Sequence, residues 1–148
     1  LTVKLFKMRE IKFRIFEDGV MYKNGQYGEL DDMTSESIVV ETGSYPFILK
    51  TTCKGDAYIE RMTENSPIMQ FTGFRCKKNE VYDGDIIKHP KATEPEEKGW
   101  VVVWRDFGWK LKCVNLVNGE ELFTEFSDYF ANDCDVIGNE FENPELLS

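Results

Sequence analysis

The sequence predicts a mainly β protein: a small, strongly bent barrel or sandwich of short antiparallel strands with one or two short helices. Short runs of β-branched and aromatic residues recur along the chain, turn signals containing glycine separate them, and only two stretches carry helix signals. The 148 residues are enough for one domain with its own core. We expect a single β domain over residues 8–148. Residues 1–7 form an N-terminal extension, and Met8 is one candidate for the natural start.

The stretch REIKFRIF predicts the first strand. Ile11, Phe13 and Ile15 alternate with Lys12 and Arg14. Successive side chains of a strand point to opposite faces, so this pattern is typical of a half-buried strand. We expect the three apolar residues to face the core and the two basic residues to face away from it.

Turns and further strands follow. Asp18-Gly19 is a hairpin signal, and Asn24-Gly25 is a second turn. Strands are expected at residues 38–41, 46–53 and 68–74, the last ending at Gly73. Residues 56–67 fit either a strand or one short helix.

The C-terminal half begins with a loop from His89 to Gly99. Its two prolines and many charges predict that it is mobile and dispensable for folding. WVVVWRD and WKLKCVNLV are strong strand signals, and Asp106-Phe107-Gly108 connects them as a hairpin.

The stretch VNGEELFTEFSDYFAND has two interpretations. Asn118-Gly119 could be a hairpin turn, or Asn118 could cap a helix with Glu121 completing a capping box. We favour a helix over residues 119–131, because apolar residues recur at helical spacing. These residues are Leu122, Phe126, Tyr129 and Phe130.

The last residues predict a strand and a short helix. CDVIGN is a strand with a turn at Gly138-Asn139. Asn143 then caps a helical turn over residues 143–147, with Pro144 at its first position.

The net charge of −9 is unevenly distributed. Every Lys and Arg lies at or before Lys112, and only acidic residues follow. An acidic end disfavours nonspecific binding to nucleic acid. We expect a solvated surface there, and the alternative is an acidic face that mimics nucleic acid or docks on a basic partner.

The cysteines predict neither a metal site nor a disulfide framework. Cys53, Cys76, Cys113 and Cys134 are widely spaced and form no C-x-x-C pair. We expect free, buried thiols in a reducing cytosol.

The motif VYDGDIIKHP could be a small acidic site or a turn that leads into a strand. Gly84 can take a positive φ, and Asp83 and Asp85 are common turn residues. A hard cation needs more oxygen ligands than two local carboxylates. We favour the turn. His89 is the one histidine of the chain and has no defined partner, and no known catalytic motif is present, so we expect no enzyme activity, metal or cofactor.

Three tryptophans lie close together in the sequence, at positions 100, 104 and 109. Beside Arg105, Lys110 and Lys112 they could stack the bases of a short single strand. Core packing is the commoner use of a strand tryptophan, and we favour it.

Three segments resemble the YopX family of bacteriophage and prophage proteins. They are MREIKFRIFEDGVMY at 8–22, IMQFTGFRCKKNEVYDGDIIK at 68–88 and DVIGNEFENPELL at 135–147. Phe71 stands where the family commonly has Tyr, and the turn FRCKKNE also departs from its usual form. The matching motif residues are Gln70, Thr72, Gly73, Tyr82, Gly84, Asp85, Gly138, Asn139, Asn143 and Pro144. We expect these to be structural more than functional.

The resemblance implies a small, mainly β phage protein in the cytoplasm of a bacterial host, and it implies no enzyme activity. We expect a noncatalytic accessory protein that acts through protein–protein contacts and could form a homo-oligomer. The alternatives are a nucleic-acid-binding module and an acidic mimic that blocks a basic host protein. No apolar run is long enough for a membrane span.

Overall fold

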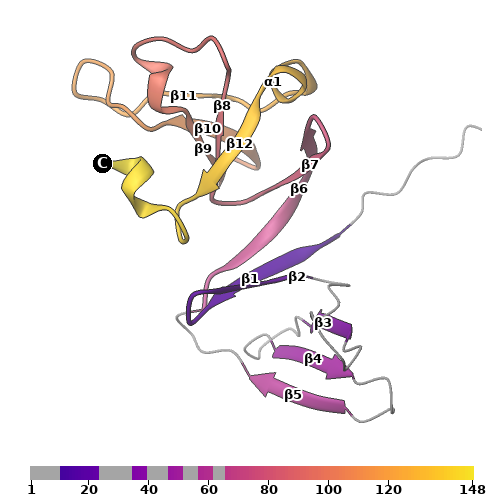
Figure 1. Ribbon diagram of the computed structural model, residues 1–148. Helices are drawn as coiled ribbons and strands as arrows, with labels where there is room; N and C mark the ends of the chain where they lie inside the picture. Colours follow the sequence, from indigo (N-terminus) through magenta and orange to yellow (C-terminus); the bar gives the residue numbers. More distant parts are fainter. Residues whose placement is uncertain (1–10, 24–34, 40–46, 52–56, 62–65) are drawn as a thin grey trace, which may run out of the picture.

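A computed structural model describes residues 11–23, 35–39, 47–51, 57–61 and 66–148 (Figure 1). The expected extension at residues 1–7 and the expected turn at Asn24-Gly25 lie outside the described residues. Strands dominate, all strand pairs are antiparallel, and helices are few and short, so the predicted fold class is confirmed. None of the helices in the described residues has the length and apolar character needed to cross a membrane.

The first sheet has four strands in the order β2-β1-β6-β7. They are β1 (Phe13–Glu17), β2 (Val20–Lys23), β6 (Ile68–Cys76) and β7 (Asn79–Tyr82). The sheet containing β1, β2 and β6 curls into a half-barrel. The β1–β2 hairpin turns at Asp18-Gly19 as predicted, with φ values of 48° and 80°. Strand β6 runs past Gly73, where we expected it to end, because an irregularity between Phe71 and Arg75 lets the chain continue to Cys76.

The second sheet has five strands in the order β11-β10-β9-β8-β12. They are β8 (Asp85–Lys88), β9 (Trp100–Arg105), β10 (Gly108–Cys113), β11 (Phe123–Glu125) and β12 (Asp135–Asn139). The main core lies between this sheet, the ends of β6 and β7, and the region of α1 (Asp128–Asp133). Its fully or nearly buried members are Cys76, Val81, Ile87, Trp100, Val102, Trp109, Leu111, Cys113, Phe126, Ala131 and Cys134.

A third sheet has three strands and lies beside β1 and β2 (Figure 1). They are β3 (Ser35–Val39), β4 (Phe47–Thr51) and β5 (Ala57–Arg61). The strand predicted at 46–53 is present as β4, and the strand predicted at 38–41 overlaps the end of β3 at residues 38–39. The other residues of these two predictions lie outside the described residues. The ambiguous stretch 56–67 contains strand β5.

The helix predicted over residues 119–131 is wrong for most of its length. Asn118-Gly119 forms a hairpin turn with φ values of 54° and 80°, and β11 follows it. Only α1 (Asp128–Asp133) is helical. The hairpin forms because residues 123–125 pair with β10, a contact outside the local sequence. The helical turn predicted at 143–147 is present as the 3₁₀ helix η2 (Pro144–Leu147).

The loop from His89 to Gly99 contains the 3₁₀ helix η1 (Glu96–Lys98). It is attached to the segment after β10, because the Asn115 side chain donates a hydrogen bond to the Pro95 carbonyl at 2.8 Å. A Cβ at Gly99 would lie 2.6 Å from the Ile87 carbonyl oxygen, so this end of the loop packs closely on β8. That the loop is dispensable for folding stays a prediction.

Candidate functional site

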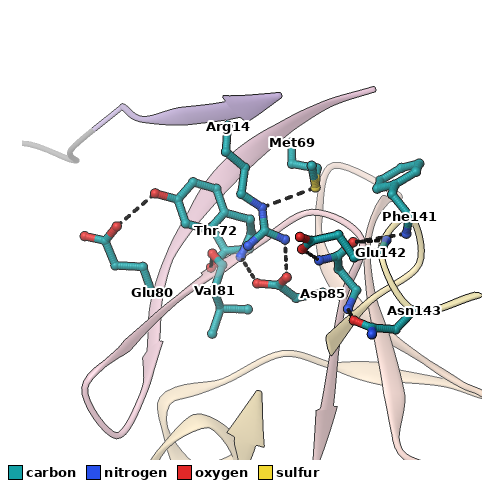
Figure 2. A network of polar contacts seen from close by, with 11 residues as sticks. Arg14, Met69, Thr72, Glu80, Val81, Asp85, Phe141, Glu142 and Asn143 are labelled. Atoms are coloured by element: carbon teal, nitrogen blue, oxygen red, sulfur yellow. Dashed lines mark hydrogen bonds and ion pairs between the residues drawn. The ribbon is translucent and has the colours of Figure 1, made fainter. Parts of the chain in front are cut away.

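A buried ion pair joins the first sheet to the start of the second. The Arg14 guanidinium on β1 donates a hydrogen bond from Nη2 to the Asp85 carboxylate on β8, and both side chains are almost fully buried (8% and 1% exposed) (Figure 2). Nε donates to the Met69 sulfur at 3.2 Å, and the guanidinium lies over the Tyr82 ring, 4.6 Å from its centre. The prediction that Arg14 faces away from the core is therefore wrong.

Asp85 also closes the turn that precedes its strand. Its second carboxylate oxygen accepts the Tyr82 backbone N–H at 2.7 Å. Between them, Gly84 has a φ of 78°, and a Cβ there would lie 2.8 Å from a Glu140 carboxylate oxygen. The turn predicted at Asp83-Gly84-Asp85 is present, and its second aspartate is the counterion of Arg14. Burial raises the pKa of Asp85 above its ordinary value, while the Arg14 charge and the Tyr82 N–H oppose that rise.

Glu80 on β7 organises a second polar cluster beside the pair. It accepts hydrogen bonds from Lys12 at 2.5 Å, from Arg75 at 2.9 Å and from the Tyr82 hydroxyl at 2.8 Å. Burial of Glu80 opposes its ionisation, yet the three donors prevail and lower its pKa to about 2. Because the Tyr82 ring contacts Arg14 and its hydroxyl contacts Glu80, this residue links the two clusters.

The third motif block, at residues 135–147, packs against the turn that contains Gly84 and Asp85. Asn139 pairs with Asp85 across β12 and β8, and the Glu140 N–H donates to the Gly84 carbonyl at 2.9 Å. The Asn139 side chain accepts two backbone N–H groups, from Phe141 and Glu142, at 3.0 and 2.9 Å. A Cβ at Gly138 would lie 2.5 Å from Asn143 Oδ1, so this glycine permits a close contact.

The remaining motif residues hold neighbouring turns. The Gln70 carbonyl accepts the Asp83 N–H at 3.0 Å, and the Thr72 hydroxyl donates to the Val81 carbonyl at 2.8 Å. Gly73 has a φ of 90° at the irregularity of β6, and Pro144 begins η2. The three sequence blocks thus meet around Arg14 and Asp85. That the ten motif residues act in folding and not in binding stays a prediction.

An open hollow lies next to the ion pair. It has a volume of about 390 Å³. Its lining residues are Arg14, Lys23, Lys78, Asn79, Glu80, Tyr82 and Val136. Sequence reasoning did not find it, because its residues come from β1, β2, the β6–β7 hairpin and β12.

The β9–β10 hairpin presents aromatic side chains at its tip. Phe107 is 99% exposed and Trp104 is 53% exposed, whereas Trp100 and Trp109 are buried. Trp104 and Trp109 meet edge to face with ring centres 5.0 Å apart. Core packing, the use we favoured, is confirmed for Trp100 and Trp109 and is wrong for Trp104. Phe107 was not singled out, since a turn position gives no sign of how far a side chain protrudes.

The acidic C-terminal segment is partly neutralised by cations from other strands. Lys110 forms an ion pair with Glu125, and Lys112 forms one with Glu121. These ion pairs connect β10 with β11 and with the residues just before β11. They engage the two lysines that we considered as contacts for single-stranded nucleic acid.

Among the described residues, no group of three His, Cys, Asp or Glu side chains is placed to hold a metal ion. The His89 ring nitrogen Nδ1 accepts the Lys91 N–H at 3.1 Å, a local contact in the loop. Cys76, Cys113 and Cys134 are free and buried, and Cys53 lies outside the described residues. Burial raises the pKa of Cys76 to about 11 and that of Cys134 to about 12, so neither thiol is activated.

The fold and this junction define a small, mainly β protein whose sheets are joined through a buried charge pair. The chain belongs to the YopX family, since the family model described as YopX protein matches residues 12–148. It is similar in fold to the crystal structure of protein EF1440 from Enterococcus faecalis, with a TM-score of 0.51 and 22% identity over 94% of this chain and 99% of that one. No curated protein matches it.

Proposed function

We propose that the protein is a noncatalytic accessory protein of a phage or prophage that binds another protein through the tip of the β9–β10 hairpin. Membership of a phage-associated family supports its origin, and the host cytoplasm is the compartment we propose. The exposure of Phe107 carries the proposal of a protein contact. A fully exposed aromatic side chain gains nothing from burial in the folded protein, whereas aromatic residues contribute strongly to interfaces.

The backbone of Phe107 strengthens this argument. Its φ is 62°, in the left-handed region, which costs a residue with a Cβ about 1–2 kcal/mol. Asn or Gly would fill this hairpin position without that cost. A residue that is both strained and exposed contributes little to the fold, so a contact with a partner is a better account of it.

Binding of single-stranded nucleic acid has less support. Two of the three tryptophans are buried, and Lys110 and Lys112 already pair with carboxylates. The acidic mimic also has less support, because Glu121, Glu125 and Asp135 are paired with lysines.

The test is capture from a lysate of the bacterial host with three forms of the full chain: wild type, Phe107→Gly and Leu116→Ser. Leu116 is the matched control, since it is a 60% exposed apolar residue outside the hairpin. We expect a protein partner with wild type and with the control, and its loss with Phe107→Gly. Capture that survives Phe107→Gly, or that disappears on nuclease treatment, would contradict the proposal. Light scattering of the purified forms shows whether the partner is a second copy.

A further inference from the structure

The hollow beside Arg14 is a positively charged place on a negatively charged protein. Three cationic side chains line it, those of Arg14, Lys23 and Lys78. Three more, Lys12, Arg75 and Lys77, belong to the clusters beside it. Within the described residues, Asp85 balances Arg14, Asp135 balances Lys77, and Glu80 lies between Lys12 and Arg75. Lys23 and Lys78 then remain as a local excess of two positive charges, while the whole chain carries −9.

The carboxylates that the structure describes near the hollow are already engaged. Asp85 forms an ion pair with Arg14, and Asp135 forms one with Lys77 at 2.5 Å. Glu80 accepts hydrogen bonds from two cationic side chains and from one hydroxyl group. Lys23 and Lys78 have no ion-pair partner in the part of the chain that the structure describes. Both lysines are exposed, so an anion can reach them from solvent.

Arg14 gives the hollow a fixed floor. Its guanidinium is held by Asp85, by Met69 and by the face of Tyr82. Within the described residues, two of its five N–H donors have acceptors, which leaves donors for a ligand. A planar, immobilised guanidinium matches the oxygens of a phosphate and loses little entropy when it binds one.

We propose that this hollow binds the phosphate group of a small molecule. Lys23 and Lys78 contact the phosphate oxygens at the rim, and Arg14 donates to them from the floor. A phosphate fits better than a carboxylate, because the local excess of positive charge favours a dianion and the cations approach from different strands. The volume of about 390 Å³ is within the usual range for small-molecule sites. This site is separate from the hairpin tip and does not depend on the proposed function.

Calorimetric titration of the full chain with inorganic phosphate and with pyrophosphate, at low ionic strength, tests the proposal. The test variant is Lys23→Ala/Lys78→Ala. The matched control is Lys91→Ala/Lys98→Ala, which removes the same charge from exposed lysines that do not line this hollow. We expect saturable binding to wild type and to the control, and a loss of at least about tenfold in affinity in the test variant, since that variant lacks two charge-assisted hydrogen bonds to the phosphate.

Two further titrants define the ligand. Acetate at the same ionic strength is expected to bind more weakly than phosphate, and equal binding would overturn the assignment to phosphate. A nucleoside monophosphate separates the sources: tighter binding than inorganic phosphate indicates a phosphate ester, and equal binding indicates free phosphate. The site itself is refuted by an absence of saturable binding, or by an equal loss of affinity in both double variants.

Discussion

Arg14 and Asp85 form a buried ion pair although 71 residues separate them in the chain. One is in the first motif block of the family and the other is in the second, and Asp85 also pairs with Asn139 of the third. A buried charge is costly unless it is paired and hydrogen-bonded. The ion pair is therefore satisfied only when the three motif blocks, which are distant in the sequence, pack together correctly.

Glu80 predicts a specific dependence of stability on pH. Its pKa falls from 4.5 in the unfolded chain to about 2 in the folded protein. A lowered pKa in the folded state means that the stabilisation is fully present above about pH 4.5 and is lost as the pH falls towards 2. We expect Glu80→Gln to reduce the free energy of unfolding at pH 7 by only about 1–2 kcal/mol, because Glu80 is partly exposed and solvent screens its ion pairs. The difference in stability between this variant and wild type is expected to shrink below pH 4.5.

Urea unfolding at pH 7, 4 and 2.5 measures this difference. Glu120→Gln is the control, because Glu120 is exposed and a substitution at an exposed position is expected to change stability by no more than about 0.5 kcal/mol. A constant difference between wild type and Glu80→Gln across this range would show that the Glu80 charge does not stabilise the fold.

Gly84 and Gly119 allow backbone strain to be separated from crowding. Their φ values are 78° and 80°, but a Cβ at Gly84 meets Glu140 and Phe141 within 3.1 Å, whereas at Gly119 nothing lies within 4 Å. We expect Gly119→Ala to cost about 1 kcal/mol through strain, and Gly84→Ala about 2–3 kcal/mol through strain and crowding together. Thermal unfolding of both variants measures these two losses of stability. Equal losses would mean that the C-terminal segment does not pack on the turn at Gly84.

Phe107 predicts a substitution that stabilises the protein. Phe107→Gly removes the strain of a left-handed φ and gives up almost no buried surface. We expect the free energy of unfolding to rise by about 1 kcal/mol. Phe107→Asn, which also tolerates this conformation, is expected to change stability in the same direction. A loss of stability in both variants would show that the ring packs against the protein, which would remove the main support for the hairpin as a contact site.

The sequence was most informative where local chemistry decides the structure. Asp18-Gly19 and the Asp83-Gly84-Asp85 turn follow from the conformational freedom of glycine and the turn chemistry of aspartate. The strands around the tryptophans follow from their residue types.

The rest depends on contacts between distant segments. Alternation placed Arg14 on the outer face of β1, and only the meeting with Asp85 explains why it is buried. The apolar spacing after Asn118 fits a helix. The structure instead has a hairpin there, because residues 123–125 pair with strand β10. Two ion pairs, Lys110 with Glu125 and Lys112 with Glu121, connect the same two segments. The hollow beside Arg14 could not be predicted, since four separate elements build it.

The most direct test of this account is a double-mutant cycle on Arg14→Met and Asp85→Asn, with stability measured by urea unfolding at pH 7. Each single change leaves one charged group buried without its partner and is expected to cost about 3–5 kcal/mol. The double variant has neither charge, so it is expected to cost less than the sum of the single changes by at least about 2 kcal/mol. Costs that add within about 0.5 kcal/mol would contradict the claim that the motif blocks are joined through this ion pair.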